Sequence, residues 1–408
     1  MRLYLLALNP TDSVTRGFLP AAARLGLDVT VLTDAAAPHH RALAGPESPE
    51  SAVGASRGRP EVLECDVRDF REVVGLISRH HAPAAVFSNS DHLQTQTALA
   101  AGYFGLPAKD WRTTLRAKNK AQLRRHLALA GLDAVWSAEL APGQEADLPD
   151  APFPCVVKPR EGVASEDVAL VADAADLRLR CAEIRRRRPG AALVVEEFLA
   201  GELYTLETLG DGRTRHVLGG FRTRLSPPPH FVEEMLEFVP AHPAPVVRQV
   251  LAQLDALGVG LGACHTEFVV QSDGRARLIE VNYRAVGDQC DLMLAEILGI
   301  PYFEHVLRAH LGEPLPADLG ARTGLRGRNE AVCADRAGTL TAAPGPYDAE
   351  HDGVRLVYRP LRPVGEHHDH YRTNRDYLGV VWAVGPVQAA VDRAVAGFVA
   401  ANRWEITP

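Results

Sequence analysis

The chain has 408 residues, 46% of them apolar and 23% charged, and a net charge of −7 at pH 7. A chain of this length can bury a sizeable core and predicts roughly two to four structural units. The acidic balance argues against a non-specific nucleic-acid binder, and no apolar run reaches the length that spans a membrane.

The six cysteines are scattered, with no CxxC pair and no spacing typical of zinc ligands. This distribution favours reduced thiols in the core over disulfides. Because reduced cysteines are typical of a reducing compartment, we expect a cytoplasmic protein.

The first quarter of the chain alternates strands and helices. Apolar runs predict strands at residues 3–8, 29–33 and 84–88, and two stretches between them, 15–25 and 70–80, predict helices. Strands separated by helices are typical of a parallel α/β layer. No GxGxxG motif follows the first strand, so a dinucleotide site there has little support.

Two polar segments interrupt this layer. Residues 88–91, SNSD, follow a predicted strand at the edge where ligands bind in open α/β sheets. They can equally cap a helix, and the cap is the favoured interpretation. Residues 44–60 are rich in Gly, Pro and Ser, which predicts a flexible insertion.

A basic amphipathic helix is predicted at residues 113–130, ended by Gly131. One of its faces carries Leu115, Leu123, Leu127 and Ala130. Lys118 and Lys120 lie in its first half, and by themselves they read as surface lysines on an exposed helix.

A strand, a lysine and a loop follow one another in residues 155–171. The apolar run 155–157 places Lys158 at the end of a core strand, and a loop at residues 161–165 leads to a second strand at 168–171. Backbone N–H groups of such loops bind anions, so this lysine is a candidate phosphate ligand. The alternative is a surface lysine on an ordinary hairpin.

A short link joins the predicted strands 193–195 and 203–209. It contains four residues in a row: Glu196, Glu197, Phe198 and Leu199. A carboxylate there can accept a hydrogen bond from the exocyclic amine of adenine while backbone groups pair with the ring nitrogens between apolar walls. The proline run 227–229 predicts an extended loop over a site.

Residues 265–284 predict a β-hairpin whose turn is centred on Asp273 and Gly274. In this register Glu267 faces Glu280. Two facing carboxylates repel each other unless a cation lies between them, and carboxylate and amide oxygens suit Mg²⁺. The alternative is a solvated hairpin face. One predicted face carries Glu280, Asn282 and Arg284, and the other carries Phe268, Val270, Ile279 and Val281.

In this order, the stretches resemble the ATP-grasp superfamily over roughly residues 1–312. The resemblance implies an α/β and α+β chain with the ATP-grasp fold. It implies a Rossmann-like α/β domain at residues 1–111, an ATP-grasp region at 112–312 with a lid at about 120–200, and a small β-rich C-terminal unit at 313–408.

The resemblance also implies roles for individual residues. Lys120, about eleven residues before Gly131, and Lys158 contact the phosphates of ATP, and Arg284 steadies the transferred phosphate. The implied catalytic residues are Arg284 and Lys158. The implied nucleotide-binding residues are Lys120, Lys158, Ser165, Glu196, Glu197, Phe198, Leu199 and Glu202. The implied Mg²⁺ ligands are Glu267, Glu280 and Asn282.

The sequence departs from the family pattern at two points. The phosphate-binding loop reads Ser165-Glu166-Asp167-Val168, where the pattern usually has glycine just before the valine, and two acids beside phosphates would repel them. Leu203 stands where the pattern places a ribose-binding glutamate. Glu202 is the candidate by a one-residue shift, and loss of that contact is the alternative.

The resemblance implies an ATP- and Mg²⁺-dependent ligase that joins a carboxylate to an amine through an acyl phosphate, as in the assembly of small peptide-like metabolites or siderophores. We expect small-molecule carboxylate and amine substrates and no nucleic-acid or membrane partner, with a homodimer as a candidate assembly. Two alternatives stay open: a small-molecule kinase on the same fold, and a nucleotide-binding protein without turnover.

The segment 366–377, EHHDHYRTNRDY, is rich in His and Arg. Its histidines lack a regular ligand spacing, so a solvated loop is favoured over a metal cluster. Arg372 and Arg375 are candidates for recognition of a carboxylate.

Overall fold

The computed structural model describes residues 1–44, 59–132, 134–321 and 323–408. The predicted insertion at residues 44–60 falls almost entirely on residues 45–58, outside the described residues. None of the described helices combines the length and apolar character that a membrane crossing requires.

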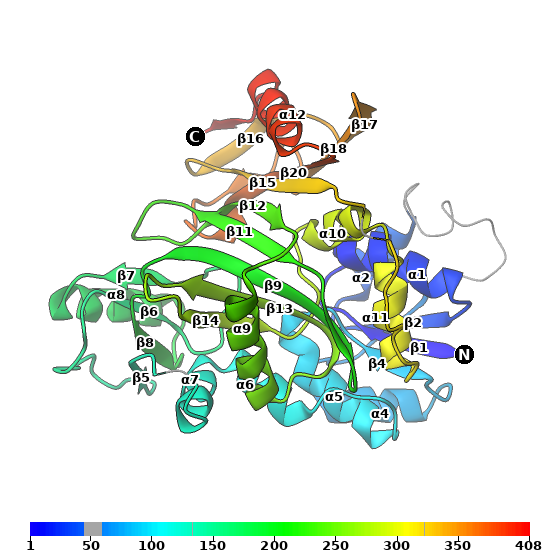
Figure 1. Cartoon of the computed structure of the whole chain (residues 1–408), viewed down its shortest axis with the longest axis horizontal. Helices are drawn as coiled ribbons and strands as arrows, with labels where there is room; N and C mark the ends of the chain where they lie inside the picture. Colours follow the sequence, from blue (N-terminus) through cyan, green and yellow to red (C-terminus); the bar gives the residue numbers. More distant parts are fainter. Residues whose placement is uncertain (45–58, 133, 322) are drawn as a thin grey trace.

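The N-terminal layer is a four-stranded sheet in the order β3-β2-β1-β4, with all neighbours parallel, as predicted. The sequence pattern missed strand β3 and helices α2 and α5. Figure 1 shows this layer at the N-terminal side of the molecule. Its strands are β1 (Arg2–Leu6), β2 (Asp28–Thr33), β3 (Glu61–Glu64) and β4 (Ala85–Phe87). Its helical segments are η1 (Ser13–Phe18), α1 (Leu19–Arg24), α2 (Ala36–Ala44), α4 (Phe70–Ser78), η2 (Asp91–Leu93) and α5 (Gln94–Tyr103).

The single helix predicted at residues 113–130 is two helices, α6 (Trp111–Lys118) and α7 (Lys120–Leu129). Asn119 lies between them in an extended conformation, which interrupts the helix. Its side chain caps α7 by accepting a hydrogen bond from the backbone N–H of Gln122. The break turns Lys120 inward and leaves Leu115, predicted on the apolar face, 38% exposed.

A second sheet, in the order β5-β8-β6-β7, has helix α8 (Ala174–Arg187) packed on it, and we refer to this sheet and helix by the predicted name, the lid. Figure 1 shows the lid at the opposite end of the molecule from the N-terminal layer. Its strands are β5 (Ser137–Leu140), β6 (Cys155–Pro159), β7 (Ala169–Val171) and β8 (Leu193–Glu197).

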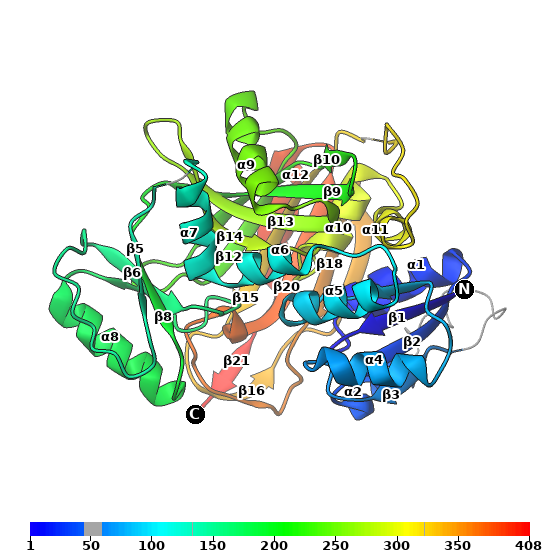
Figure 2. The same cartoon turned by 90° about the horizontal axis from the view of Figure 1, so that it is seen from below.

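The central sheet has ten strands, in the order β14-β13-β9-β11-β12-β15-β20-β18-β17, with β10 paired to β9. The predicted C-terminal unit is β-rich, but it is not separate, because β15 pairs with β12 and continues this sheet. Figure 2 shows β12, β15, β20 and β18 in one array. The strands are β9 (Glu202–Asp211), β10 (Arg215–Val217), β11 (Gly220–Leu225), β12 (Glu233–Val239), β13 (Leu261–Val270), β14 (Ala276–Asn282), β15 (Arg326–Cys333), β17 (Tyr347–His351), β18 (Val354–Pro360) and β20 (Tyr377–Gly385).

Helices α9 (Ala244–Leu257), α10 (Cys290–Leu298), α11 (Tyr302–His310) and α12 (Gln388–Ala401) complete the framework with η3 (Asn374–Asp376) and a small sheet of β16 (Gly338–Ala342), β19 (His367–His368) and β21 (Glu405–Thr407). One apolar core joins the N-terminal layer to the central sheet through α10 and α11. Phe18 contacts Phe87 and Phe303 within it, with ring centroids 4.6 and 5.0 Å apart. The layers that meet at the site are therefore held by shared packing.

The hairpin β13–β14 has the predicted register where the metal-site residues lie, since Glu267 pairs with Glu280. Beyond that pair the register shifts by one, so Phe268 pairs with Leu278 and leaves Ile279 as a bulge. The prediction that Ile279 lies on the face of Phe268 is therefore wrong, because the bulge turns it to the cavity side.

Candidate active site

A cavity of about 820 Å³ lies where the lid, the N-terminal layer and the central sheet meet. Its volume is within the usual range for small-molecule sites. The structure brings eleven predicted site residues to its lining: Lys120, Lys158, Ser165, Glu196, Glu197, Phe198, Leu199, Glu267, Glu280, Asn282 and Arg284.

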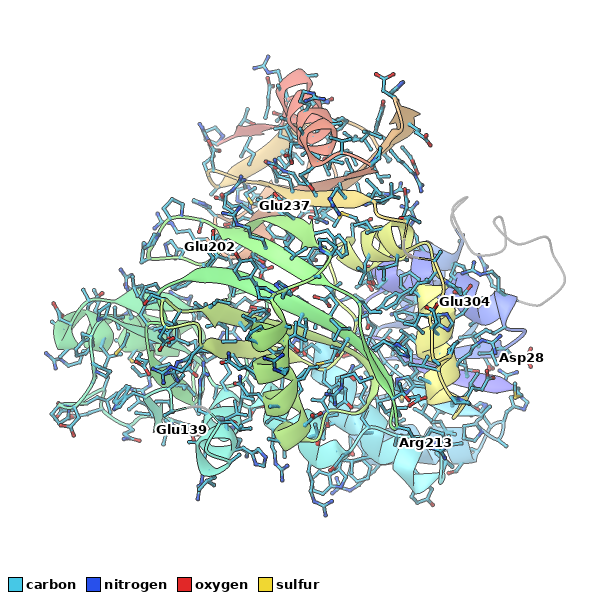
Figure 3. All side chains as sticks on the ribbon, viewed as in Figure 1. Asp28, Glu139, Glu202, Arg213, Glu237 and Glu304 are labelled. Carbon is cyan, nitrogen blue, oxygen red and sulfur yellow. The ribbon has the colours of Figure 1, made fainter. Side chains whose placement is uncertain are left out.

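Glu202 is separated from this group. Its neighbour Leu203 lines the cavity, and successive side chains of strand β9 point to opposite faces. The Glu202 carboxylate accepts from the Tyr204 hydroxyl and from Arg222, both at 2.6 Å. Figure 3 labels it on the central sheet. The one-residue shift proposed for the ribose contact has no support in this geometry.

Lys158 is held by Glu196 at the end of strand β6. Its Nζ lies 2.8 Å from Glu196 Oε2, and Arg124 donates to both oxygens of the same carboxylate at 3.1 and 3.0 Å. Burial by itself would raise the pKa of Glu196, but Arg124 and Lys158 hold it down, to about 2. Glu196 is thus occupied in orienting Lys158 rather than free to accept from adenine.

Sequence reasoning missed Arg124. It lies on α7 four residues after Lys120, so both side chains face the same side of the helix. That spacing is the signal that identifies it, once α7 is known to begin at Lys120.

Lys120 is buried, contrary to the expectation of a surface lysine. Its Nζ donates to Glu280 at 2.6 Å and to the carbonyl of Gly162 at 3.4 Å. Burial opposes its charge, but the Glu280 carboxylate outweighs burial and raises the pKa of Lys120. Lys118 also donates to the Gly162 carbonyl, at 3.2 Å, and pairs with Asp91. The two lysines therefore join helices α6 and α7 to the loop above the cavity.

The three predicted metal ligands lie together. Glu267 faces Glu280 across the hairpin, and Asn282 donates from Nδ2 to Glu267 at 3.1 Å, which leaves its Oδ1 as a further oxygen. Two carboxylates and an amide oxygen are hard donors that fit Mg²⁺. Among the described residues, no group of three or more His, Cys, Asp or Glu side chains is arranged for a metal, so the third candidate ligand here is the amide oxygen of Asn282.

His265, which the sequence analysis left without a role, lines the cavity beside these ligands. Its Nδ1 lies 2.7 Å from Glu207 and its Nε2 lies 3.5 Å from Glu267. Burial would lower the pKa of His265, but Glu207 and Glu267 raise it to about 10. The imidazolium therefore places a fixed positive charge next to the carboxylate pair.

The N-terminal layer contributes residues 88–91 to the same space. Asn89 and Asp91 line the cavity, and Asn89 accepts from the backbone N–H of Ala285 at 3.0 Å. Ser90 precedes helix η2 without a side-chain cap. The segment therefore provides the N-cap residue of η2, as the favoured interpretation has it, but without a capping side chain, and it also lies at the ligand-binding edge of the sheet.

An apolar cluster lines the part of the cavity nearest the link after β8. Its lining members are Leu199, Leu203, Leu225, Val269 and Ile279, and Val135 packs with them outside the lining. Phe198 and Phe231 lie near each other on the cavity lining, with ring centroids 6.5 Å apart. These walls suit a flat heteroaromatic ring.

The two acids of the phosphate-binding loop do not face the cavity as free charges. Glu166 pairs with Arg188 and with Arg375. Asp167 pairs with Arg187 at 2.6 Å and with Arg188 at 2.5 Å. Because arginines neutralise both carboxylates, the repulsion expected from the sequence is removed.

The segment 366–377 is partly ordered by its own contacts. His368 is buried and contacts Asp376 at 2.9 Å, whereas His367 is exposed. The expectation of a solvated loop is therefore wrong for His368. Arg375, a candidate for substrate recognition, is engaged with Glu166 instead.

The other half of the cavity is rich in polar groups from the central sheet and α10. Glu233, Asp288, Gln289, Asn329 and Tyr377 line it. Burial, with the nearby Glu267 carboxylate, raises the pKa of Glu233 to about 8. This half therefore offers carboxylates and amides to a second polar molecule.

Residues 151–292 match the model of the ATP-grasp domain family. The chain is 28% identical over 434 positions to y4rH, an uncharacterized protein of Sinorhizobium fredii. The alignment covers all of this chain and 84% of that protein. It is 30% identical over 168 residues to the D-alanine–D-alanine ligase of Anaeromyxobacter, with 37% of this chain and 52% of that enzyme covered.

The fold is that of solved ATP-grasp enzymes. An L-amino acid ligase from Bacillus licheniformis superposes with a TM-score of 0.80 at 21% identity, covering 100% of this chain and 99% of that one. The biotin carboxylase domain of the Hydrogenobacter thermophilus 2-oxoglutarate carboxylase, solved with MgADP and bicarbonate, superposes with a TM-score of 0.69 at 14% identity, covering 100% and 90%. ATP and Mg²⁺ are the cofactors that ATP-grasp enzymes use, as the sequence resemblance implied.

Proposed function

We infer that this chain, which carries an ATP-grasp domain at residues 151–292 and has the ATP-grasp fold, is an ATP- and Mg²⁺-dependent ligase that joins a carboxylate to an amine. The observation that carries the proposal is one cavity with lysines, apolar walls and a carboxylate pair in one half, and room for a second molecule in the other. The solved L-amino acid ligase and the D-alanine–D-alanine ligase support amino acids as the substrates of such a reaction. Small peptide-like metabolites or siderophores are the products that we propose. We place the reaction in the cytoplasm.

In this proposal the lid and the central sheet bind ATP between them. The apolar cluster holds the adenine ring, while Lys158, fixed by Glu196, and Lys120 contact the phosphates. Glu267, Glu280 and Asn282 would hold Mg²⁺, which would supply positive charge against the phosphates. Catalysis of this kind rests on position and charge, so a nucleophilic side chain is not required.

The reaction has two steps. A carboxylate oxygen of the first substrate attacks the γ-phosphorus, the bond to the β-phosphate breaks, and ADP and an acyl phosphate form. In this proposal Arg284, which lines the cavity, contacts the transferred phosphoryl group. The nitrogen of the amine substrate then attacks the acyl carbon, loses a proton, and releases inorganic phosphate as the amide forms.

Capture of the acyl phosphate tests the proposal. The protein is incubated with ATP, Mg²⁺, hydroxylamine and panels of amino acids and di- or tricarboxylates, and the products are followed by phosphorus NMR. We expect one carboxylate to give a hydroxamate together with ADP and free phosphate. AMP and pyrophosphate as the only nucleotide products would overturn the mechanism. A phosphorylated product without free phosphate would instead identify a kinase, and nucleotide binding without any turnover a non-catalytic protein.

A further inference from the structure

The loop over the nucleotide half of the cavity is held from the C-terminal part of the chain. We call residues 162–168 the phosphate loop and residues 373–377 the latch segment. Arg375 of the latch segment donates to the carboxylate of Glu166. The backbone N–H of Asn374 donates to the carbonyl of Ala164 at 3.2 Å. Two separate contacts thus join segments about 200 residues apart.

The phosphate loop has a conformation that needs outside support. The backbone φ angles of Ala164, Ser165 and Asp167 are 55°, 54° and 58°. Residues other than glycine rarely adopt such positive φ angles. Such positions persist when surrounding contacts determine them. Glu166, which is 8% exposed, lies between the guanidinium groups of Arg188 and Arg375 and supplies those contacts.

The latch segment also contacts the substrate half of the cavity. Asn374 accepts from the backbone N–H of Glu233 at 3.1 Å and donates to its carboxylate at 3.4 Å. The Tyr377 hydroxyl donates to the carbonyl of Glu233 at 2.6 Å. One short segment therefore contacts the phosphate loop and the start of strand β12 together.

We propose that Asn374 and Arg375 are positioning residues that hold the phosphate loop closed over the bound nucleotide. This gives a role to the His- and Arg-rich segment 366–377 and to Glu166, which precedes the position where the family pattern has glycine and this chain has Asp167. The loop is fixed by the ion pair of Glu166 with Arg375. The inference rests on the proposed function, because the nucleotide that the loop covers is ATP.

Hydrogen exchange of the phosphate loop tests the inference without turnover. In the ligand-free protein we expect Arg375→Ala to speed amide exchange across residues 162–168 about fivefold, because the pair is partly exposed and of modest strength. Arg375→Lys should restore part of the protection. Arg336→Ala is the matched control, since Arg336 is an exposed arginine of the same region that pairs only with its neighbour Asp335. Equal exchange in wild type and Arg375→Ala would overturn the inference.

A second variant keeps the test independent of folding. Glu166→Gln removes the same ion pair from the other side, together with the pair between Glu166 and Arg188, and the double variant with Arg375→Ala should exchange no faster than Glu166→Gln alone. Fully additive effects would overturn the pairing. If the Arg375→Ala protein does not fold, Glu166→Gln alone decides, with wild-type exchange as the overturning result.

Adding AMP-PNP with Mg²⁺ separates this inference from the proposed function. If the proposed function and the latch both hold, AMP-PNP slows amide exchange of the phosphate loop in wild type. About fivefold more AMP-PNP is then needed to give the same protection in Arg375→Ala. Absence of any nucleotide protection in wild type would refute the proposed function. Equal protection of the two proteins at every concentration would refute the latch.

Discussion

At the residue scale, the site depends on charges that are buried and paired. Glu196, Lys158 and Arg124 are each about 5% exposed or less. Removing one member of such a group leaves an uncompensated charge away from water, which is far more unfavourable than losing a surface pair. Substitution of buried Arg124 should therefore be more destabilising than substitution of an exposed residue on the same helix.

We expect Arg124→Met to lower the free energy of unfolding by about 3 kcal/mol, since Glu196 then keeps only Lys158 as its partner. Lys158 should also lose its fixed position, so the KM for ATP should rise. Urea denaturation and ATP-dependent kinetics measure the two effects. Arg125→Met, which removes an exposed arginine from the same helix, is the control. Equal stability of the two variants would contradict the role given to Arg124.

Lys109 is a buried charge of a different kind. Its Nζ donates to Gln94 at 2.7 Å and to the carbonyl of Tyr283 at 2.5 Å, and Gln94 donates to the carbonyl of Ser88 at 2.9 Å. It therefore ties the end of strand β14 to the end of strand β4, where both meet the cavity. Burial lowers the pKa of Lys109 to about 7.

This pKa predicts a pH dependence of stability. In the unfolded chain the pKa of lysine stays near 10.5, so between pH 7 and 10.5 the unfolded chain binds a proton that the folded chain has released. The free energy of unfolding should therefore rise with pH over that range, and the unfavourable contribution is fully present below pH 7. Urea denaturation at pH 7, 8 and 9 should show wild type gaining stability relative to Lys109→Met. A difference that does not change with pH would exclude this account.

At the element scale, the hairpin β13–β14 carries the metal ligands and one wall of the cavity. The bulge at Ile279 lets adjacent residues of one strand serve both purposes, because Ile279 and Glu280 both reach the cavity. An unbroken strand would point one of them away.

We expect Glu280→Gln and Asn282→Ala each to abolish Mg²⁺-dependent ADP formation while the protein stays folded. Glu280→Gln relieves the repulsion from Glu267 but also takes the carboxylate partner from buried Lys120, so we expect its unfolding temperature to fall. Asn282→Ala removes no charge, so its unfolding temperature should fall by no more than a few degrees. Glu237→Gln, on strand β12 of the same sheet, is the control. Near wild-type turnover by either hairpin variant with Mg²⁺ would remove these residues from the metal site.

At the scale of the whole molecule, the C-terminal residues are part of the central framework. Strand β15 pairs with β12, β20 pairs with β15, and Tyr377, Val380 and Trp382 enter the core shared with the N-terminal layer. A domain boundary near residue 312 would therefore cut through the central sheet, which has strands from both sides of that residue.

We expect a chain ending at residue 312 not to fold, because it loses the strands beyond β12 and exposes an unpaired edge and an open core. Near-ultraviolet circular dichroism and gel filtration of the refolded fragment measure this. A monomeric fragment with native-like dichroism that unfolds cooperatively would show that the C-terminal part is a separate unit after all.

The sequence by itself determined what local chemistry controls. The Asp273-Gly274 turn predicted the hairpin that carries Glu267 and Glu280, although the bulge at Ile279 brings these two opposite each other, because Val270 pairs with Ala276 next to the turn. The apolar run at residues 155–157 placed Lys158 at the end of a strand. These features depend on residues close together in the chain, where propensity, turn type and alternation act directly.

Only the tertiary structure decided which charges meet across long separations. Arg124 with Glu196, Arg375 with Glu166, and β15 with β12 join segments that no local pattern relates. The break at Asn119 and the bulge at Ile279 could likewise not be predicted from the sequence. Each is a small departure from a regular helix or strand period, and it is stabilised by packing against residues distant in the chain. Burial and the partner of a charge are properties of the folded whole, and they decide whether a lysine lies on the surface or inside the site.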